Sequence, residues 1–177
     1  MSKLEGIAAE LAAEMNGKVE ILQGIFTFHF AYEGYSTTGN INNRAFNVEL
    51  KYTGEMTIVC NCDTSLHFDI LPNTISQRLE IFAEPKILSG NGEFDKTFLI
   101  RSAAKRDMIS WISQVGIMES IRMLAPFEYL GFHGRVLEYK TSINIDTISA
   151  SQILDKAKII LEIATSLETS FFKEDKI

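Results

Sequence analysis

The stretch AFNVELKYTGEMTIVCNC, residues 45–62, carries apolar side chains at every second position on both sides of a Thr53-Gly54-Glu55 turn. Such alternation is typical of strands with one buried and one wetted face, because successive side chains of a strand point to opposite faces. The apolar positions that share one face are Phe46, Val48, Leu50, Tyr52, Met56, Ile58, Cys60 and Cys62. The stretch therefore predicts an antiparallel hairpin with one face on a core.

The same alternation extends the sheet in both directions along the chain. Residues 18–22 and 25–33 indicate two strands joined by a tight turn at Gly24, and residues 66–70 indicate a fifth strand downstream. The polar stretch GYSTTGNINNR, residues 34–44, interrupts the pattern and is interpreted as a loop. Five short strands with tight connections predict an antiparallel meander.

Helix signals stand at both ends of the chain. Ser2 with Glu5, and Ser149 with Gln152, fit the capping-box pattern, in which a hydroxyl and a side chain three residues later satisfy the first backbone N–H groups. Apolar residues at helical spacing follow both caps. Because helices and strands come in groups, the order favours an α+β fold over a doubly wound one. We expect the terminal helices to cover the apolar face of the sheet.

Between the meander and the last helix, the chain predicts a central helix pair and a hairpin. The pair runs from a cap at Ser102 to Pro126, and the hairpin comprises residues 127–132 and 135–143. Residues 74–86 fit either a short helix or a strand. Residues 1–177 are predicted to form a single domain, since their length suits one hydrophobic core.

The glycine-containing stretch SGNGEFDKTFLIRS, residues 89–102, is the nearest approach to a phosphate-binding loop. It lacks the Gly-Lys-Ser/Thr that leads into a helix, and its carboxylates would repel a phosphate. Asn91 and Gly92 suit a turn, and the alternation from Phe94 to Arg101 predicts a strand.

Net charge and cysteine content indicate which partners and which cellular compartment the protein is expected to have. The net charge is −6, and the longest basic run is two residues, so nucleic-acid binding is disfavoured. The sequence contains neither a signal-peptide pattern nor an apolar run long enough to span a membrane. Cys60 and Cys62 lie too close in sequence for an unstrained disulfide. We therefore expect a soluble, cytoplasmic protein with reduced thiols.

The sequence predicts no catalytic residue, no cofactor and no metal centre. His29, Glu49 and His67 fall on the polar face of the predicted strands, and two imidazoles with a carboxylate suit Zn²⁺. The expected meander order places other strands between them, so they are interpreted as surface residues. The cysteines are interpreted as small core residues, because Cys-x-Cys lacks a second pair to complete a site.

The polar segment 34–44 holds the candidate ligand-binding residues. These are Tyr35, Asn40, Asn42 and Arg44, which combine hydrogen-bonding groups with an aromatic ring. Loops carry binding residues more often than core elements do, so we predict that a ligand of unknown identity contacts this segment.

From about residue 86, the run KILSGNGEFDKTFLIRS, then a helix pair, a hairpin and a long helix, resembles a group of uncharacterised bacterial domains. Their Gly-x-x-Phe-Asp-x-x-Phe-like motif corresponds, with shorter spacing, to the segment from Gly92 to Phe98. The resemblance covers the second half of the chain. It implies a bacterial protein and supplies no catalytic residues.

Two functions remain open from the sequence. The first is a non-enzymatic protein-binding or scaffold domain, whose partner is another protein or a second copy that forms a homodimer. The alternative is a hydrophobic small-molecule carrier with a cavity between the sheet and the C-terminal helix. The rings expected to line that cavity are Phe26, Phe28, Phe30, Phe46 and Phe68.

Overall fold

The computed structural model describes residues 1–27, 30–74 and 86–171. Within them, nine strands form one sheet in the order β1-β2-β3-β4-β9-β8-β5-β7-β6, and neighbouring strands are antiparallel. The strands are β1 (Lys18–Thr27), β2 (Phe30–Ile41), β3 (Arg44–Lys51), β4 (Glu55–Asn61), β5 (Phe68–Pro72), β6 (Lys86–Ile87), β7 (Phe98–Arg101), β8 (Tyr129–His133) and β9 (Val136–Ser142).

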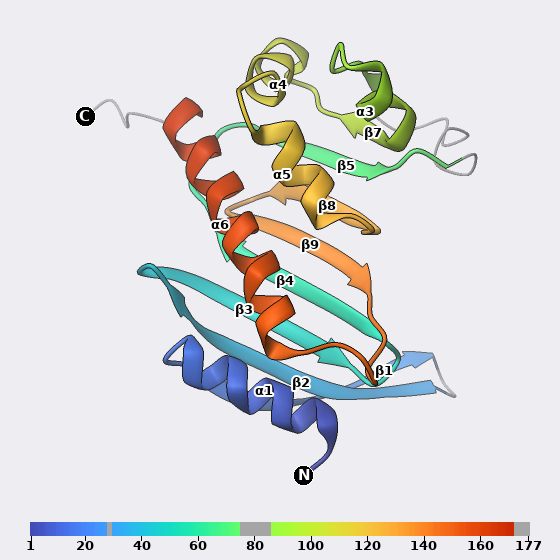
Figure 1. Cartoon of the computed structure of the whole chain (residues 1–177), viewed down its shortest axis with the longest axis vertical. Helices are drawn as coiled ribbons and strands as arrows, with labels where there is room; N and C mark the ends of the chain where they lie inside the picture. Colours follow the sequence, from blue (N-terminus) through green and yellow to red (C-terminus); the bar gives the residue numbers. More distant parts are fainter. Residues whose placement is uncertain (28–29, 75–85, 172–177) are drawn as a thin grey trace.

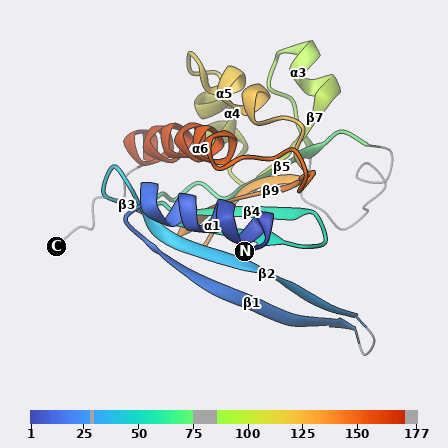
Figure 2. The same ribbon diagram turned by 60° about the horizontal axis from the view of Figure 1, so that its bottom comes forward.

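The described helices lie over one face of this sheet, which confirms the predicted α+β fold (Figure 1, Figure 2). They are α1 (Lys3–Glu14), α3 (Gly92–Thr97), α4 (Lys105–Ile112), α5 (Ile117–Leu124) and α6 (Ala150–Phe171). None of the described helices combines the length and the apolar character that crossing a membrane takes.

Both predicted capping boxes are confirmed. The Ser2 hydroxyl accepts a hydrogen bond from the Glu5 N–H, and the Glu5 carboxylate accepts one from the Ser2 N–H. Ser149 and Gln152 make the equivalent pair at the start of α6. Ser102 accepts from the Ala104 N–H, but α4 begins only at Lys105, so the predicted helix start there is early. Caps fix where α1 and α6 begin, and so which of their faces meets the sheet.

The β8–β9 hairpin lies in the middle of the sheet, which corrects the predicted five-strand meander. Strands β1 to β4 follow one another as expected, but β4 pairs next with β9, and β5 pairs with β8 and β7. The inward side chains of the hairpin are large and fully buried: Leu130, Phe132, Leu137 and Tyr139. A central position covers such side chains on all sides, whereas an edge position would leave them partly in water.

The first hairpin is longer than the sequence pattern suggested. Gly24 is paired within the β1–β2 ladder, so the predicted turn there is wrong. Residues 34–41 continue β2, so the predicted loop is wrong as well. The chain reverses at Asn42 and Asn43, whose φ angles of 49° and 64° are those of a two-residue turn that asparagine tolerates.

Two polar residues of β2, Ser36 and Thr37, are buried and hydrogen-bonded, and the Ser36 hydroxyl donates to Asn47 Oδ1 at 2.7 Å. The Thr37 hydroxyl is fully buried and donates to the Ala8 carbonyl of α1 at 3.4 Å. Gly39 lets α1 approach closely, since a Cβ there would lie 2.5 Å from the Cβ of Met15. Small polar side chains here therefore indicate contact with α1, not a loop.

Residues 92–97 form α3, and the strand predicted from Phe94 to Arg101 begins only at Phe98. The Asn91 carboxamide accepts from the Phe94 N–H at 3.0 Å and caps the helix in place of making a hairpin turn. The rings of Phe94, in α3, and Phe98, the first residue of β7, contact each other at a tilt, with centroids 4.8 Å apart. Of the ambiguous segment 74–86, residues 75–85 lie outside the described residues, and Lys86 begins the short β6.

Side chains fill the space between α6 and the sheet. The α6 residues that face the sheet are fully buried, and they meet fully buried side chains of β4 and β9. Tyr139 also donates its hydroxyl to the Leu124 carbonyl at 3.0 Å, which joins the sheet to the end of α5. The side chains of residues 24–32 lie outside the described part, so the expected lining by Phe26, Phe28 and Phe30 is not tested.

Candidate functional site

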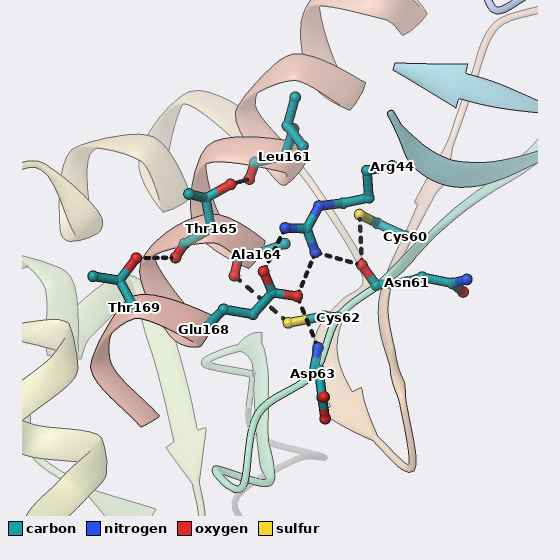
Figure 3. A network of polar contacts seen from close by, with 10 residues as sticks. All are labelled: Arg44, Cys60, Asn61, Cys62, Asp63, Leu161, Ala164, Thr165, Glu168 and Thr169. Carbon is teal, nitrogen blue, oxygen red and sulfur yellow. Dashed lines mark hydrogen bonds and ion pairs between the residues drawn. The ribbon is translucent and has the colours of Figure 1, made fainter. Parts of the chain in front are cut away.

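A charged contact joins the start of β3 to the last turns of α6 (Figure 3). The Arg44 guanidinium donates to both carboxylate oxygens of Glu168, at 2.6 and 2.5 Å, and to the Asn61 carbonyl at 2.7 Å. The Glu168 carboxylate also accepts from the Asp63 N–H at 2.9 Å. We call Arg44 and Glu168, with these two backbone contacts, the Arg44 clamp.

The electrostatics of the clamp favour the ionised form of both residues. The hydrogen bond from Arg44 lowers the pKa of Glu168, and the Glu168 carboxylate in turn raises the pKa of Arg44. Both side chains are largely buried, with exposed fractions of 18% and 25%. Paired, charge-assisted hydrogen bonds of this kind are stronger than neutral ones. The clamp therefore acts first as a structural tie between α6 and the sheet.

Cys60 of β4 and Cys62, just after its end, lie beside the clamp and are free, buried thiols, as the sequence predicted for core residues (Figure 3). Burial raises the pKa of each thiol to about 12. The Cys62 thiol donates to the Ala164 carbonyl of α6 at 3.6 Å. Because the thiolate is the reactive form, neither cysteine has the environment of a nucleophile at neutral pH.

The four residues predicted to bind a ligand do not gather in one place. Asn40 and Arg44 line the same shallow hollow of about 590 Å³ beside the clamp. Asn42 lines a different hollow, along α6. Tyr35 lies farther back on β2, where it is the Cα partner of Ile21. Glu168 already occupies the guanidinium of Arg44, and ligand binding in this hollow stays a prediction.

Tyr35 belongs to an apolar strip at the edge of the sheet. Val19 and Ile21 share the inner face of β1, and their side chains are 37% and 71% exposed. Tyr35 lies next to Ile21 in the ladder, and its ring is 6.2 Å from the ring of the exposed Tyr52. We call Val19, Ile21, Tyr35 and Tyr52 the edge patch. It lies beside α1, because Thr37, the Cα partner of Val19, donates to the Ala8 carbonyl, and the hydroxyls of Tyr52 and Ser2 share a hydrogen bond of 2.6 Å.

The metal-site residues named from sequence are not brought together. Glu49 lies on β3 between Ser36 and Thr57, whereas the ring of His67 lies 6.2 Å from that of His133 on β8. His29 lies outside the described residues. In the part of the chain that the structure describes, no group of three or more His, Cys, Asp or Glu side chains is placed to share a metal ion.

Sequence reasoning missed the polar contacts around His133. Its Nε2 lies 2.7 Å from the Asp69 carboxylate, and the Tyr129 hydroxyl donates to the same oxygen at 2.8 Å. Burial, and then the hydrogen bond to Asp69, raises the pKa of Tyr129, so the phenol remains a donor. These residues are about sixty positions apart, and only the unexpected pairing of β5 with β8 joins them.

Comparison with known proteins finds a solved structure of the same fold but identifies no family. No family model matches the chain. No curated protein matches it either. Among solved structures, it is similar to the crystal structure of the mycobacterial trehalose monomycolate transport factor A, TtfA, with a TM-score of 0.65 and 10% identity. The likeness covers 94% of this chain and 96% of that one. At this identity, the similarity shows that the two chains share a fold.

Proposed function

We propose that the chain is a non-enzymatic binding domain that receives an extended segment of a protein partner along β1. The observation that carries this proposal is the combination of an open sheet edge with the edge patch. β1 is ten residues long and stands first in the strand order, and β2 is its paired neighbour within the described residues. Its other side is therefore available for backbone hydrogen bonds to an added strand.

The edge patch supplies the apolar part of such an interface. An added strand brings side chains to both faces of the sheet, and those on the inner face would cover Val19 and Ile21. Full burial of an isoleucine contributes about 1.5–3 kcal/mol, and Ile21 is 71% exposed in the free chain. On the outer face, Lys18 and Glu20 give the edge a charge pattern that selects among strands and opposes aggregation.

The alternative function, a hydrophobic small-molecule carrier, has less support. Its cavity was expected between the sheet and α6, and buried side chains of both layers occupy that space. TtfA is named as a transport factor, but a shared fold does not transfer the cargo of that protein to this chain. We place the binding function in the cytoplasm, in keeping with the two free thiols.

Site-specific photo-crosslinking tests this proposal. A photoreactive amino acid replaces Ile21 in one chain and Thr57, on the outer face of central strand β4, in a matched control. We expect protein adducts from position 21 and few from position 57. The captured protein, once purified, should then bind the wild-type chain at least tenfold more tightly than an Ile21→Glu variant.

Three other outcomes have distinct meanings. An adduct of twice the chain mass would identify the partner as a second copy. A lipid-like adduct at position 21, or a co-purified lipid seen by native mass spectrometry, would favour the carrier. Equal labelling from positions 21 and 57 would contradict binding at β1.

A further inference from the structure

Two exposed histidines lie close together where β5 begins and β8 ends. His67 directly precedes β5 and His133 ends β8, and both side chains are exposed. Their ring centroids lie 6.2 Å apart. His133 is on the outer face, because its neighbour Phe132 points inward. The His67 ring lies at the end of the strand pair, 5.4 Å from the ring of the buried Phe132, and is itself exposed.

The carboxylate of Asp69 holds one of these rings in a defined orientation. Its Oδ1 lies 2.7 Å from Nε2 of His133 and accepts from the Tyr129 hydroxyl at 2.8 Å. A Cβ at Gly131 would lie 2.2 Å from the Tyr129 hydroxyl oxygen, so only glycine lets the phenol cross to Asp69. With Nε2 as the donor to the carboxylate, neutral His133 keeps its lone pair on Nδ1.

We propose that His67 and His133 bind one divalent transition-metal ion, with Asp69 orienting His133 from the outer shell. Imidazole nitrogens suit Zn²⁺ and Cu²⁺, and metal-binding histidines commonly donate their second ring N–H to a carboxylate. Water completes the coordination, since the described residues contain no third ligand in reach. The ion at this site is therefore exchangeable, and the fold does not depend on it.

The separation of the two rings fits one shared ion. Metal–nitrogen bonds of about 2.0–2.1 Å limit the ring centres of two bridged imidazoles to about 6.4 Å, and a tetrahedral angle brings them to about 5.2 Å. The observed 6.2 Å lies within that limit. The His67 carbonyl accepts from the Ser102 hydroxyl at 2.6 Å, so the backbone is anchored and only side-chain torsions need to change.

The neighbouring charges leave room for a cation. Glu138 and Lys140 of the adjacent strand pair with each other at 2.9 Å, so they largely cancel. Asp69 contributes the negative charge nearest to His133, with its oxygen in direct contact with the ring. Arg101 is the Cα partner of Asp69 on the other side and is buried.

Calorimetric titration of the untagged chain with Zn²⁺ and, separately, Cu²⁺ tests the proposal. We expect one ion per chain near neutral pH, and at least a tenfold loss of affinity for both His67→Ala and His133→Ala. Asp69→Asn should lose about 10–100-fold, as outer-shell partners do. His29→Ala removes the third histidine of the chain and is the matched control, which should bind as the wild type does.

An NMR measurement on the wild-type chain tests the site without any substitution that could disturb the fold. Cu²⁺ should broaden the amide NMR signals of residues 67–69 and 131–134 before any others. The proposal is overturned by the absence of saturable binding. It is equally overturned by equal losses for His29→Ala and His67→Ala, or by broadening elsewhere.

Discussion

The middle and the edge of the sheet carry the same sequence pattern, but their inward side chains differ in burial. In β4, the inward Ile58 is completely buried beneath α6, whereas the inward Ile21 of β1 is 71% exposed. Both follow an alternation of apolar and polar side chains. Alternation thus specifies which face a side chain occupies, and the number and length of the helices decide whether that face is covered. The uncovered part of an apolar face is where a partner can bind.

The largest effect is expected in the middle of the sheet, at Ile58. We expect Ile58→Ala to lower the free energy of unfolding by about 2–5 kcal/mol, because it removes buried methylene groups and leaves a cavity. Urea unfolding followed by circular dichroism measures the loss. A loss below about 1 kcal/mol would mean that the core beneath α6 is loosely packed, contrary to the burial of its side chains.

A second difference separates the Arg44 clamp from an exposed ion pair. Arg44→Met leaves the Glu168 carboxylate partly buried without its partner, and should cost about 1–3 kcal/mol in urea unfolding. The control is Lys96→Met, which breaks the pair with Glu93, where the side chains are 74% and 79% exposed. That change should cost less than about 1 kcal/mol. Equal costs for the two variants would show that the clamp is not a structural tie.

The clamp also predicts how stability depends on pH. The pKa of Glu168 is lowered in the folded chain, so its contribution is present above the unfolded value of about 4.3 and is lost as pH falls through the lowered folded value. We expect the stability advantage of the wild type over Glu168→Gln to shrink across that acidic range. Urea unfolding of both chains at several pH values measures the difference. A constant advantage would contradict the assigned pKa shift.

The smallest effect is expected at the edge. Ile21→Ala should change the free energy of unfolding by less than about 0.5 kcal/mol, because its side chain is already largely in water. The same substitution should nevertheless weaken binding of a captured partner. A large loss of stability would show that Ile21 is needed for the fold, and would remove it from the proposed interface.

Local signals predicted much of this fold. The caps at Ser2 and Ser149 and the alternation over residues 45–62 depend on neighbours within a few positions, and all three are confirmed. The loop assigned to residues 34–44 was wrong because polarity was taken for exposure. Thr37 is buried with a hydrogen-bond partner, and the Asn42-Asn43 pair was an available turn signal.

The contacts in the candidate sites could not be predicted from short stretches of sequence. Arg44 and Glu168 are 124 positions apart, and neither carries a pattern that points to the other. The pairing of His67 with His133 depends on β8 lying beside β5, while sequence order suggested β4 as that neighbour. Strand order in a sheet is set by how side chains of all strands pack together, so it does not follow from any single segment. The resemblance of residues 86–102 to uncharacterised bacterial domains stays a prediction.

The central place of the β8–β9 hairpin has a consequence during protein synthesis. The chain makes β1 to β4 first, and then β5 to β7, yet in the sheet of the described residues β8 and β9 lie between these two groups. A nascent chain that ends before Tyr129 therefore holds two partial sheets, each with an unprotected border. Such long-range closure slows folding and prolongs the exposure of those borders. Ribosome-associated factors that shield nascent chains should therefore matter most for this protein until its last third has emerged.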